Sequence, residues 1–290
     1  MATLEYESLD RRWDHEKPLP ATARERYAAS LEQLGLDGAN LVHVGHSTHL
    51  LALGAARFLT DPWFSDPAFG ALRHERGPAV GPGDVGRLDA ILVSHDHPDH
   101  ADLDAMDRMD KQARVLVATA ALAARVRARG FRDVSVLAPG EETQVADVRV
   151  AAVPAQHDVY EVGFVLTRAS SRGTDCVYFA GDTRLFPGLE AIRERYAPSA
   201  AILPVDGTRV RGRELAVMRP EDAAVAMTRL DVRVAVPSHA DAYVGDLFAR
   251  HALLDYVPKA AERFVQIART RAKANQRVVS PVPGELVSLV

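Results

Sequence analysis

Three histidines and two aspartates occupy the six residues from His95 to His100, and Ser94 alone separates them from the apolar run Leu88–Val93. That run predicts a buried β-strand, so the polar cluster follows the end of a strand. On an extended or turning backbone His95 and His97 point the same way, because side chains two apart share a face. Imidazole and carboxylate groups together suit divalent metals such as Zn²⁺, Mn²⁺ or Fe²⁺. The stretch therefore predicts a metal site, and Asp99 and His100, one turn later, suit a second ion.

The spacing His95-x-His97-x-Asp99-His100 resembles the signature of the metallo-β-lactamase-fold hydrolases, and the resemblance runs from about Leu41 to the C-terminus. Gly45-His46-Ser47-Thr48 followed by Asp61-Pro62 is similar to the opening of one branch, which includes ascorbate-6-phosphate lactonase and N-acylphosphatidylethanolamine phospholipase D. Members of that branch usually have alanine where this chain has Ser47. The resemblance implies an α/β (α+β) fold, a four-layer αβ/βα sandwich with the metals at one edge between two sheets.

Three further residues are candidate ligands, and each follows an apolar strand-like run. His157 would complete a first site, because a tetrahedral centre needs a third protein ligand beside the pair on one loop. Asp182 lies in Gly181-Asp182-Thr183, and in the resembling family this aspartate bridges two metals; the alternative is a helix cap for the segment near Leu189–Tyr196. His239 ends the strand-like run from Val232. The expected sites are His95, His97 and His157; Asp99, His100 and His239; and Asp182 between them.

Two other groups are candidates for contact with substrate. The first comprises His46, with a structural role as the alternative, and Trp63 and Phe64, which begin a long loop that forms either a binding wall or a cap on the core. The second is the basic loop with Arg209, Arg211 and Arg213, whose guanidinium groups either grip an anionic substrate or are simply solvated.

Alternating strands, turns and helices in the middle of the chain favour an α/β layer fold. One example is the strand-like run Arg114–Ala118, followed by Thr119 as an N-cap, a helix over Ala120–Arg129 and a stop at Gly130. Another is the helix after Arg219, with Pro220 in its first turn. Helices are also expected over Leu247–Leu254 and Pro258–Ala274.

Residues 1–39 are expected to form an N-terminal helical arm, outside the hydrolase domain of residues 40–290. Tyr27, Leu31 and Leu34 make a thin apolar stripe in this arm. The stripe would lie on the main body or on a second subunit, so a homo-oligomer formed through the arm is one expectation.

Charge and cysteine content limit the partners and the compartment. With 35 basic and 39 acidic residues the formal net charge is −4, which disfavours nucleic acid as a partner. Cys176 is the single cysteine, which excludes an intrachain disulfide and fits a reducing compartment. No signal peptide is visible, and no apolar run approaches the ~18 residues that span a bilayer. The expected location is the cytoplasm.

These observations predict an enzyme that uses two divalent ions, with Zn²⁺ first and Mn²⁺ or Fe²⁺ as alternatives. A metal-bound water with its pKa lowered to ~7 would attack a small ester, lactone or phosphoester, and Asp99 would orient the nucleophile and pass a proton to the leaving group. One alternative is a phosphodiesterase acting on lipid or nucleic acid. Another is a non-hydrolytic metal-binding protein on the same scaffold.

Overall fold

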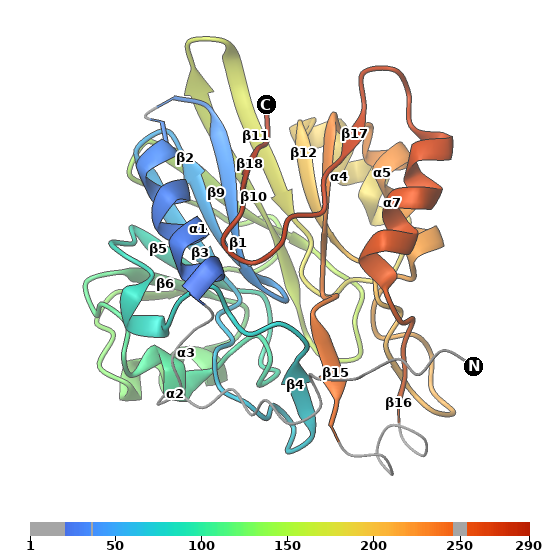
Figure 1. Cartoon of the computed structure of the whole chain (residues 1–290). Coiled ribbons are helices and arrows are strands. Elements are labelled where there is room, and N and C mark those ends of the chain that lie inside the picture. Colours follow the sequence, from blue (N-terminus) through green and yellow to red (C-terminus); the bar gives the residue numbers. More distant parts are fainter. Residues whose placement is uncertain (1–20, 36, 246–253) are drawn as a thin grey trace.

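A computed structural model describes residues 21–35, 37–245 and 254–290 of the chain. Two seven-stranded sheets lie face to face, and helices cover the outer face of each (Figure 1). This is the expected four-layer αβ/βα arrangement. Among the described residues no helix is long and apolar enough to cross a membrane.

The first sheet has the strand order β18-β1-β2-β3-β5-β6-β7. Its strands β1, β2 and β3 form an antiparallel meander, whereas β3, β5, β6 and β7 run parallel. The bounds are β1 (Ala39–Gly45), β2 (Thr48–Leu53), β3 (Ala56–Thr60), β5 (Ala90–Val93), β6 (Arg114–Val117), β7 (Val134–Val136) and β18 (Leu286–Ser288).

The second sheet has the order β17-β14-β12-β11-β10-β9-β8. Strands β8 to β11 pair antiparallel, and β11, β12, β14 and β17 pair parallel. The bounds are β8 (Glu142–Val145), β9 (Val148–Pro154), β10 (Val162–Ser170), β11 (Gly173–Phe179), β12 (Ala200–Pro204), β14 (Val234–Ser238) and β17 (Arg277–Val278).

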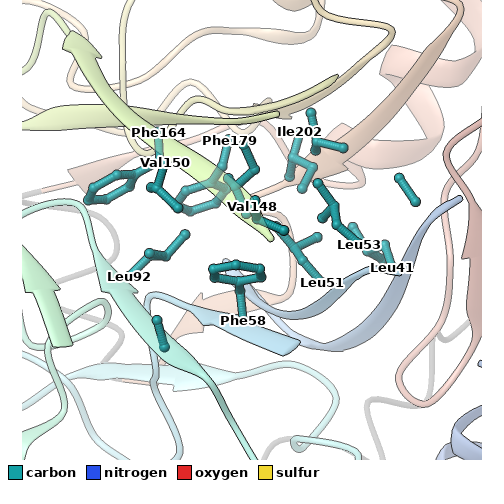
Figure 2. Packing of buried hydrophobic residues seen from close by; sticks show 14 of the residues in the cluster. Leu41, Leu51, Leu53, Phe58, Leu92, Val148, Val150, Phe164, Phe179 and Ile202 are labelled. Carbon is teal, nitrogen blue, oxygen red and sulfur yellow. The ribbon is translucent and has the colours of Figure 1, made fainter. Parts of the chain in front are cut away.

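The main core lies between the sheets, because successive side chains of a strand point to opposite faces. In β2, Leu51 packs into this core while Leu50 packs under the outer helices; in β3, Phe58 and Leu59 divide in the same way. Figure 2 shows Phe58 and Leu92 from one sheet opposite Phe164 and Phe179 from the other. Both sheets are thus apolar on both faces, which is typical of sheets covered by helices.

Helices α1 (Ala21–Gln33), α2 (Leu103–Met106) and α3 (Ala120–Ala128) lie on the side of the first sheet, and α4 (Gly188–Tyr196), α5 (Pro220–Leu230) and α7 (Ala260–Arg271) cover the second. The Thr119 side chain accepts a hydrogen bond from the amide of Leu122, and Pro220 is in the first turn of α5, so both start signals are confirmed. The expected helix over Leu247–Leu254 lies almost wholly outside the described residues.

The N-terminal stripe packs within the chain. Tyr27 is buried against the first sheet's outer layer, and its hydroxyl donates to the carbonyl oxygen of Val85 at 2.8 Å. The Ser30 hydroxyl donates to the carbonyl of Gly284 at 2.7 Å. Because α1 uses its apolar side in this way, the stripe gives no argument for an oligomer.

Short elements complete the edge at which β5, β11 and β14 end. They are the pairs β4 (Leu72–His74) with β15 (Ala242–Val244), and β13 (Arg209–Val210) with β16 (Leu254–Asp255). A 3₁₀ turn over Pro82–Asp84 lies instead beside α1, where Asp84 pairs with Arg24. The loops at the edge where β5, β11 and β14 end carry the predicted metal ligands.

Candidate metal centre

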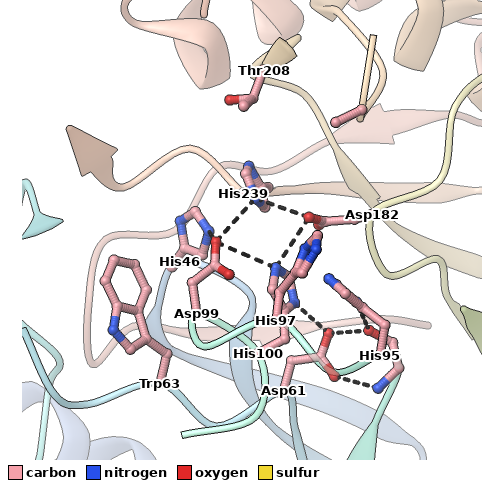
Figure 3. A network of polar contacts seen from close by, with 12 residues as sticks. His46, Asp61, Trp63, His95, His97, Asp99, His100, Asp182, Thr208 and His239 are labelled. Atoms are coloured by element: carbon pink, nitrogen blue, oxygen red, sulfur yellow. Dashed lines mark hydrogen bonds and ion pairs between the residues drawn. The ribbon is translucent and has the colours of Figure 1, made fainter. Parts of the chain in front are cut away.

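Seven predicted ligands from four loops lie together at this edge, and Figure 3 labels all of them except His157. The loop after β5 supplies four of them; β9, β11 and β14 each end just before one more. They are His95, His97, Asp99, His100, His157, Asp182 and His239. The alternative role of Asp182 as a helix cap is wrong, because α4 begins after Pro187 and Asp182 lies buried against two of the histidines.

The first cluster consists of His95, His97 and His157. Their ring centroids are 4.5–5.1 Å apart. The Nδ1 atom of His97 is 3.3 Å from the Nε2 atom of His157. Two nitrogens bound tetrahedrally to one zinc at about 2.0–2.1 Å would be separated by about 3.3 Å, so this spacing fits an ion between them.

The second cluster consists of Asp99, His100 and His239, and the structure adds His46 to it. All four residues are buried. Asp182 joins them through Oδ2, which is 3.1 Å from His100 Nε2 and 3.0 Å from His239 Nε2. The rings of His95 and His100 are 4.3 Å apart, so the two clusters are immediate neighbours.

Asp61 anchors one histidine of each cluster. Its Oδ2 atom accepts hydrogen bonds from His100 Nδ1 at 2.7 Å and from the Ser94 hydroxyl at 2.6 Å. Ser94 Oγ in turn lies 2.9 Å from His95 Nδ1. Because the Nδ1 atoms are occupied, the Nε2 atoms of both rings point toward the clusters. Carboxylates commonly fix metal-binding histidines in this way.

Other partners fix the remaining rings. His157 Nδ1 donates to the carbonyl oxygen of Ala216 at 2.9 Å, and His239 Nδ1 is 3.1 Å from Asp206 Oδ2. Glu161 is fully buried; its Oε1 atom is 3.3 Å from His95 Nδ1 and accepts the amide hydrogen of Asp182 at 2.5 Å. Glu161 thereby connects a residue of the first cluster with the aspartate between the clusters.

The sequence reasoning missed the roles of Asp61, Glu161 and Asp206. Asp61 belongs to the Asp61-Pro62 motif of the sequence analysis, which assigned it no role in the site. An Asp-Pro pair directly after an apolar run was a signal that could have identified it. Glu161 begins an unpredicted strand region and Asp206 belongs to a loop considered only for its arginines. Nothing in their local sequence distinguishes these two from surface carboxylates.

The pKa shifts differ between the clusters. Burial lowers the pKa of His95 to about 3 and that of His97 to about 4, with neighbouring histidines adding to the effect, so both rings are neutral at pH 7. Burial also opposes charge on His100, but Asp182 and Asp99 outweigh it and hold its pKa well above the usual value. The carboxylates of Asp99 and Asp182 therefore favour a positive charge at the second cluster.

The donor set fits divalent metal ions. Neutral imidazoles and carboxylates are the ligands such ions take. His95 Nε2, Asp99 Oδ1 and Asp182 Oδ1 are buried and have no hydrogen-bond partner among the described residues. Leaving buried polar atoms unsatisfied is costly, and bound ions would satisfy them.

Two of the predicted substrate contacts, Trp63 and Phe64, are fully buried, and Phe64 belongs to the core beneath the first sheet's helices. The structure therefore does not support direct contact of either side chain with a substrate; they cap the core because the loop folds inward there.

Arg209, Arg211 and Arg213 are exposed near the tip of the loop over residues 206–218. Arg209 and Arg211 both pair with Asp255 across β13 and β16, each at 3.2 Å. The two ends of this loop contact His239 and His157, through Asp206 and Ala216. The loop thus borders the clusters, while two of its three arginines have an acidic partner.

Known proteins resemble the chain over most of its length. A family model described as the β-lactamase superfamily domain matches residues 56–240. A UPF0173 metal-dependent hydrolase of Rubrobacter xylanophilus is 32% identical over 218 residues, covering 70% of this chain and 82% of that protein. Its counterpart in Caldivirga maquilingensis is 30% identical over 201 residues, covering 68% and 79%. The crystal structure of a possible metal-dependent hydrolase from Veillonella parvula matches with a TM-score of 0.70 at 18% identity, over 87% of this chain and 99% of that one.

Proposed function

Because the chain belongs to the UPF0173 metal-dependent hydrolases of the metallo-β-lactamase superfamily, we propose that it hydrolyses a small ester, lactone or phosphoester with two divalent metal ions. His95, His97 and His157 would hold the first ion. Asp99, His100 and His239 would hold the second, and Asp182 would contact both. Zn²⁺ is the first choice for this donor set, and Mn²⁺ and Fe²⁺ are the alternatives.

The observation that carries this proposal is the adjacency of the two clusters. The centroids of the His95 and His100 rings are 4.3 Å apart, and Asp182 lies buried beside them. Its Oδ2 atom contacts the second cluster, and its Oδ1 atom has no hydrogen-bond partner in the part of the chain that the structure describes. Hydrolytic sites with two metals hold their ions about 3.5–4 Å apart. Ions bound there would supply an activated water nucleophile and positive charge for the developing oxyanion.

Asp99 is the proposed catalytic carboxylate. Its Oδ2 atom faces three imidazoles of the second cluster, whereas its buried Oδ1 atom has no partner among the described residues. Although burial opposes its ionisation, His100 and His239 hold the pKa of Asp99 well below the usual value. The ionised Oδ1 is therefore available to orient a water molecule and to pass its proton to the leaving group.

Exposed apolar side chains near the first cluster support a substrate that is partly apolar. Phe69 is 58% exposed and its ring meets that of His97 edge-on, with centroids 5.3 Å apart. Val159 and Tyr160 are exposed directly after His157 and Asp158. An isolated apolar residue on a surface means little, but several beside one reactive centre favour a substrate with an apolar portion.

The branch with ascorbate-6-phosphate lactonase and N-acylphosphatidylethanolamine phospholipase D, which the Gly45-His46-Ser47-Thr48 motif resembles, supports lactones and phosphoesters as the first substrates to examine. Cleavage of lipid or nucleic-acid phosphodiesters is the second candidate, and the exposed guanidinium of Arg213 is the feature that favours it. The net charge of −4 gives nucleic acid no general attraction.

The test combines metal analysis with a substrate panel. Protein purified without chelators should contain about two transition-metal ions per chain and hydrolyse at least one of a set of lactones, carboxyl esters and phosphodiesters. Protein with no metal, both as purified and after reconstitution, would refute the proposal. Two bound ions without hydrolysis of any panel member would favour the non-hydrolytic alternative.

A further inference from the structure

His46 lies in the tight turn between β1 and β2, and its backbone is fixed there in a left-handed conformation with φ of 53°. The Thr60 hydroxyl donates to the carbonyl of Ser47 at 2.8 Å, and the Thr48 hydroxyl donates to the carbonyl of Asp61 at 2.8 Å. These bonds tie the turn to β3 and to the Asp61 loop. The ring of His46 is therefore presented from a rigid element.

The position of the ring matches that of two predicted ligands. Asp99 Oδ2 is 3.8 Å from His46 Nε2, 3.8 Å from His100 Nε2 and 3.7 Å from His239 Nε2. One carboxylate oxygen thus faces three imidazole nitrogens at nearly equal distances (Figure 3). His46 is fully buried, and neither of its ring nitrogens has a hydrogen-bond partner among the residues that the structure describes.

We propose that His46 is an additional protein donor to the metal ion held by Asp99, His100 and His239, an inference that rests on the proposed function. With Asp182, that ion would have five protein donors, whereas the first ion would have three histidines and Asp182. Catalytic ions need open coordination positions for water and substrate, and the first ion, with fewer protein donors, would keep more of them open. The substrate would therefore meet the first ion, on the side where Phe69 and Tyr160 are exposed.

The anchoring of His46 sets the size of the expected effect. His95, His100, His157 and His239 each have Nδ1 next to a fixing partner, which strengthens a histidine as a ligand. His46 has no such partner among the described residues. Its ring packs against those of Trp63 and His239, with centroids 5.0 and 4.1 Å away. Loss of His46 should therefore lower the affinity for the second ion by about tenfold. This is the lower end of the range found when groups around a metal ion are altered.

The experiment is a titration of metal-free protein with Zn²⁺ in competition with a chromophoric chelator. Wild type should bind two ions. In both His46→Ala and His46→Asn the affinity for one ion should fall about tenfold or more, while the other stays within about twofold. Asparagine tolerates the left-handed backbone, so His46→Asn guards against misfolding of the alanine variant. His239→Ala gives the expected loss of a ligand at the same ion.

His49→Asn is the matched control, because His49 is a fully buried histidine of the same hairpin that lies outside the clusters. It should bind both ions as wild type does. A Zn²⁺-loaded crystal structure of the unaltered protein provides a direct check that needs no variant: a ring nitrogen of His46 should lie about 2.0–2.1 Å from an ion.

Unchanged affinities in a folded His46 variant, or a His46 ring that touches neither ion in the loaded structure, would overturn the inference and leave the proposed function standing. Wild type that binds fewer than two ions would instead overturn the proposed function itself.

Discussion

Three residues around the metal centre have left-handed backbone conformations although none is a glycine. The φ angles are 53° for His46, 33° for Asp61 and 52° for His239. Such conformations are uncommon for residues with a Cβ atom and concentrate where the surrounding structure enforces them, often at functional sites. Each of the three turns a buried imidazole or carboxylate toward the clusters, which supports a function for the site as a whole.

His97→Ala tests the first cluster at the scale of one residue. The substitution should remove one ion and reduce kcat/KM by at least about a hundredfold, since altering even the outer partners of a metal costs about 10- to 100-fold. The fold should persist, because His97 lies in a loop and is only half-buried. Metal content, kcat/KM and the thermal midpoint are measured together.

Asp96→Asn is the matched control for this variant. Asp96 belongs to the same turn but pairs with Arg125, away from the clusters. It should keep both ions and near-normal turnover. Wild-type turnover in His97→Ala would show that His97 binds no essential ion.

At the scale of elements, the buried Tyr27 hydroxyl makes one of the hydrogen bonds that hold α1 to the rest of the chain. Tyr27→Phe removes the bond to the Val85 carbonyl and leaves that oxygen without this donor. The free energy of unfolding should fall by about 1–2 kcal/mol. Urea unfolding measures the loss, and Tyr160→Phe is the control, because it makes the same chemical change on a residue that is 55% exposed. Equal stability of the two variants would show that the hydroxyl contributes nothing.

The β1–β2 hairpin should make stability depend on pH through His49. Burial, followed by the nearby His43, holds the pKa of His49 well below its usual 6.5. Below pH 6.5 the unfolded chain takes up a proton that the folded chain does not. The free energy of unfolding therefore falls as the pH decreases below 6.5, by up to about 1.4 kcal/mol per unit for this group.

Replacement of His49 by glutamine should remove this contribution, so the decline between pH 6.5 and 5.5 becomes about 1 kcal/mol shallower than in wild type. The measurement is urea unfolding of both proteins in excess chelator, because other titrating groups then cancel in the comparison. Parallel pH profiles would exclude His49 as a source of the dependence.

The arginines of the loop over residues 206–218 are the candidate contacts for an anionic substrate. If its arginines contact an anionic group, replacing Arg209, Arg211 and Arg213 together by alanine should raise KM about ten- to a hundredfold for a phosphorylated substrate, with little change in kcat. Because Asp255 already pairs with Arg209 and Arg211, Arg213→Ala alone should give most of the effect. An unphosphorylated analogue is the matched substrate, and equal effects on both would remove the loop from this role.

On the scale of the whole molecule, bound metal should stabilise the fold. The clusters join loops from both sheets, and several of their buried ligand atoms have no hydrogen-bond partner among the described residues. Binding at a hundredfold excess over Kd adds about 2.7 kcal/mol per site. Chelation should therefore lower Tm by about 4–5 °C per site and abolish hydrolysis, and Zn²⁺ should restore both. A Tm that does not respond to chelation would contradict this expectation.

The order of strands explains how ligands from distant parts of the chain meet. Strands β3, β5 and β6 run parallel in one sheet, as β11, β12 and β14 do in the other. The carboxyl ends of β5, β11 and β14 therefore deliver His95, Asp182 and His239 to one edge of the sandwich. Ligand binding at the carboxyl ends of strands is general in α/β sheets.

The sequence by itself determined those parts of the protein that local spacing encodes. Short apolar runs predicted several central strands, and the Thr119 and Pro220 signals predicted where two helices begin. The His95-x-His97-x-Asp99-His100 spacing predicted a metal site, and the structure brings its members together with His157, Asp182 and His239. The sequence shows no clear pattern for β10. Five buried residues of that strand are followed by half-buried and exposed ones, without alternation.

Only the tertiary structure decided which polar side chains are buried and which partners they meet. Trp63 and Phe64 became core residues and His46 joined the second cluster, because the β1–β2 turn and the loop after β3 fold onto the same edge. Asp61, Glu161 and Asp206 fix histidines that are 33 to 66 residues away in the chain. The shortest of these separations is Asp206 to His239, and the longest is Glu161 to His95. Contacts of this kind depend on how the two sheets pack together, so the periodicity of the sequence cannot predict them.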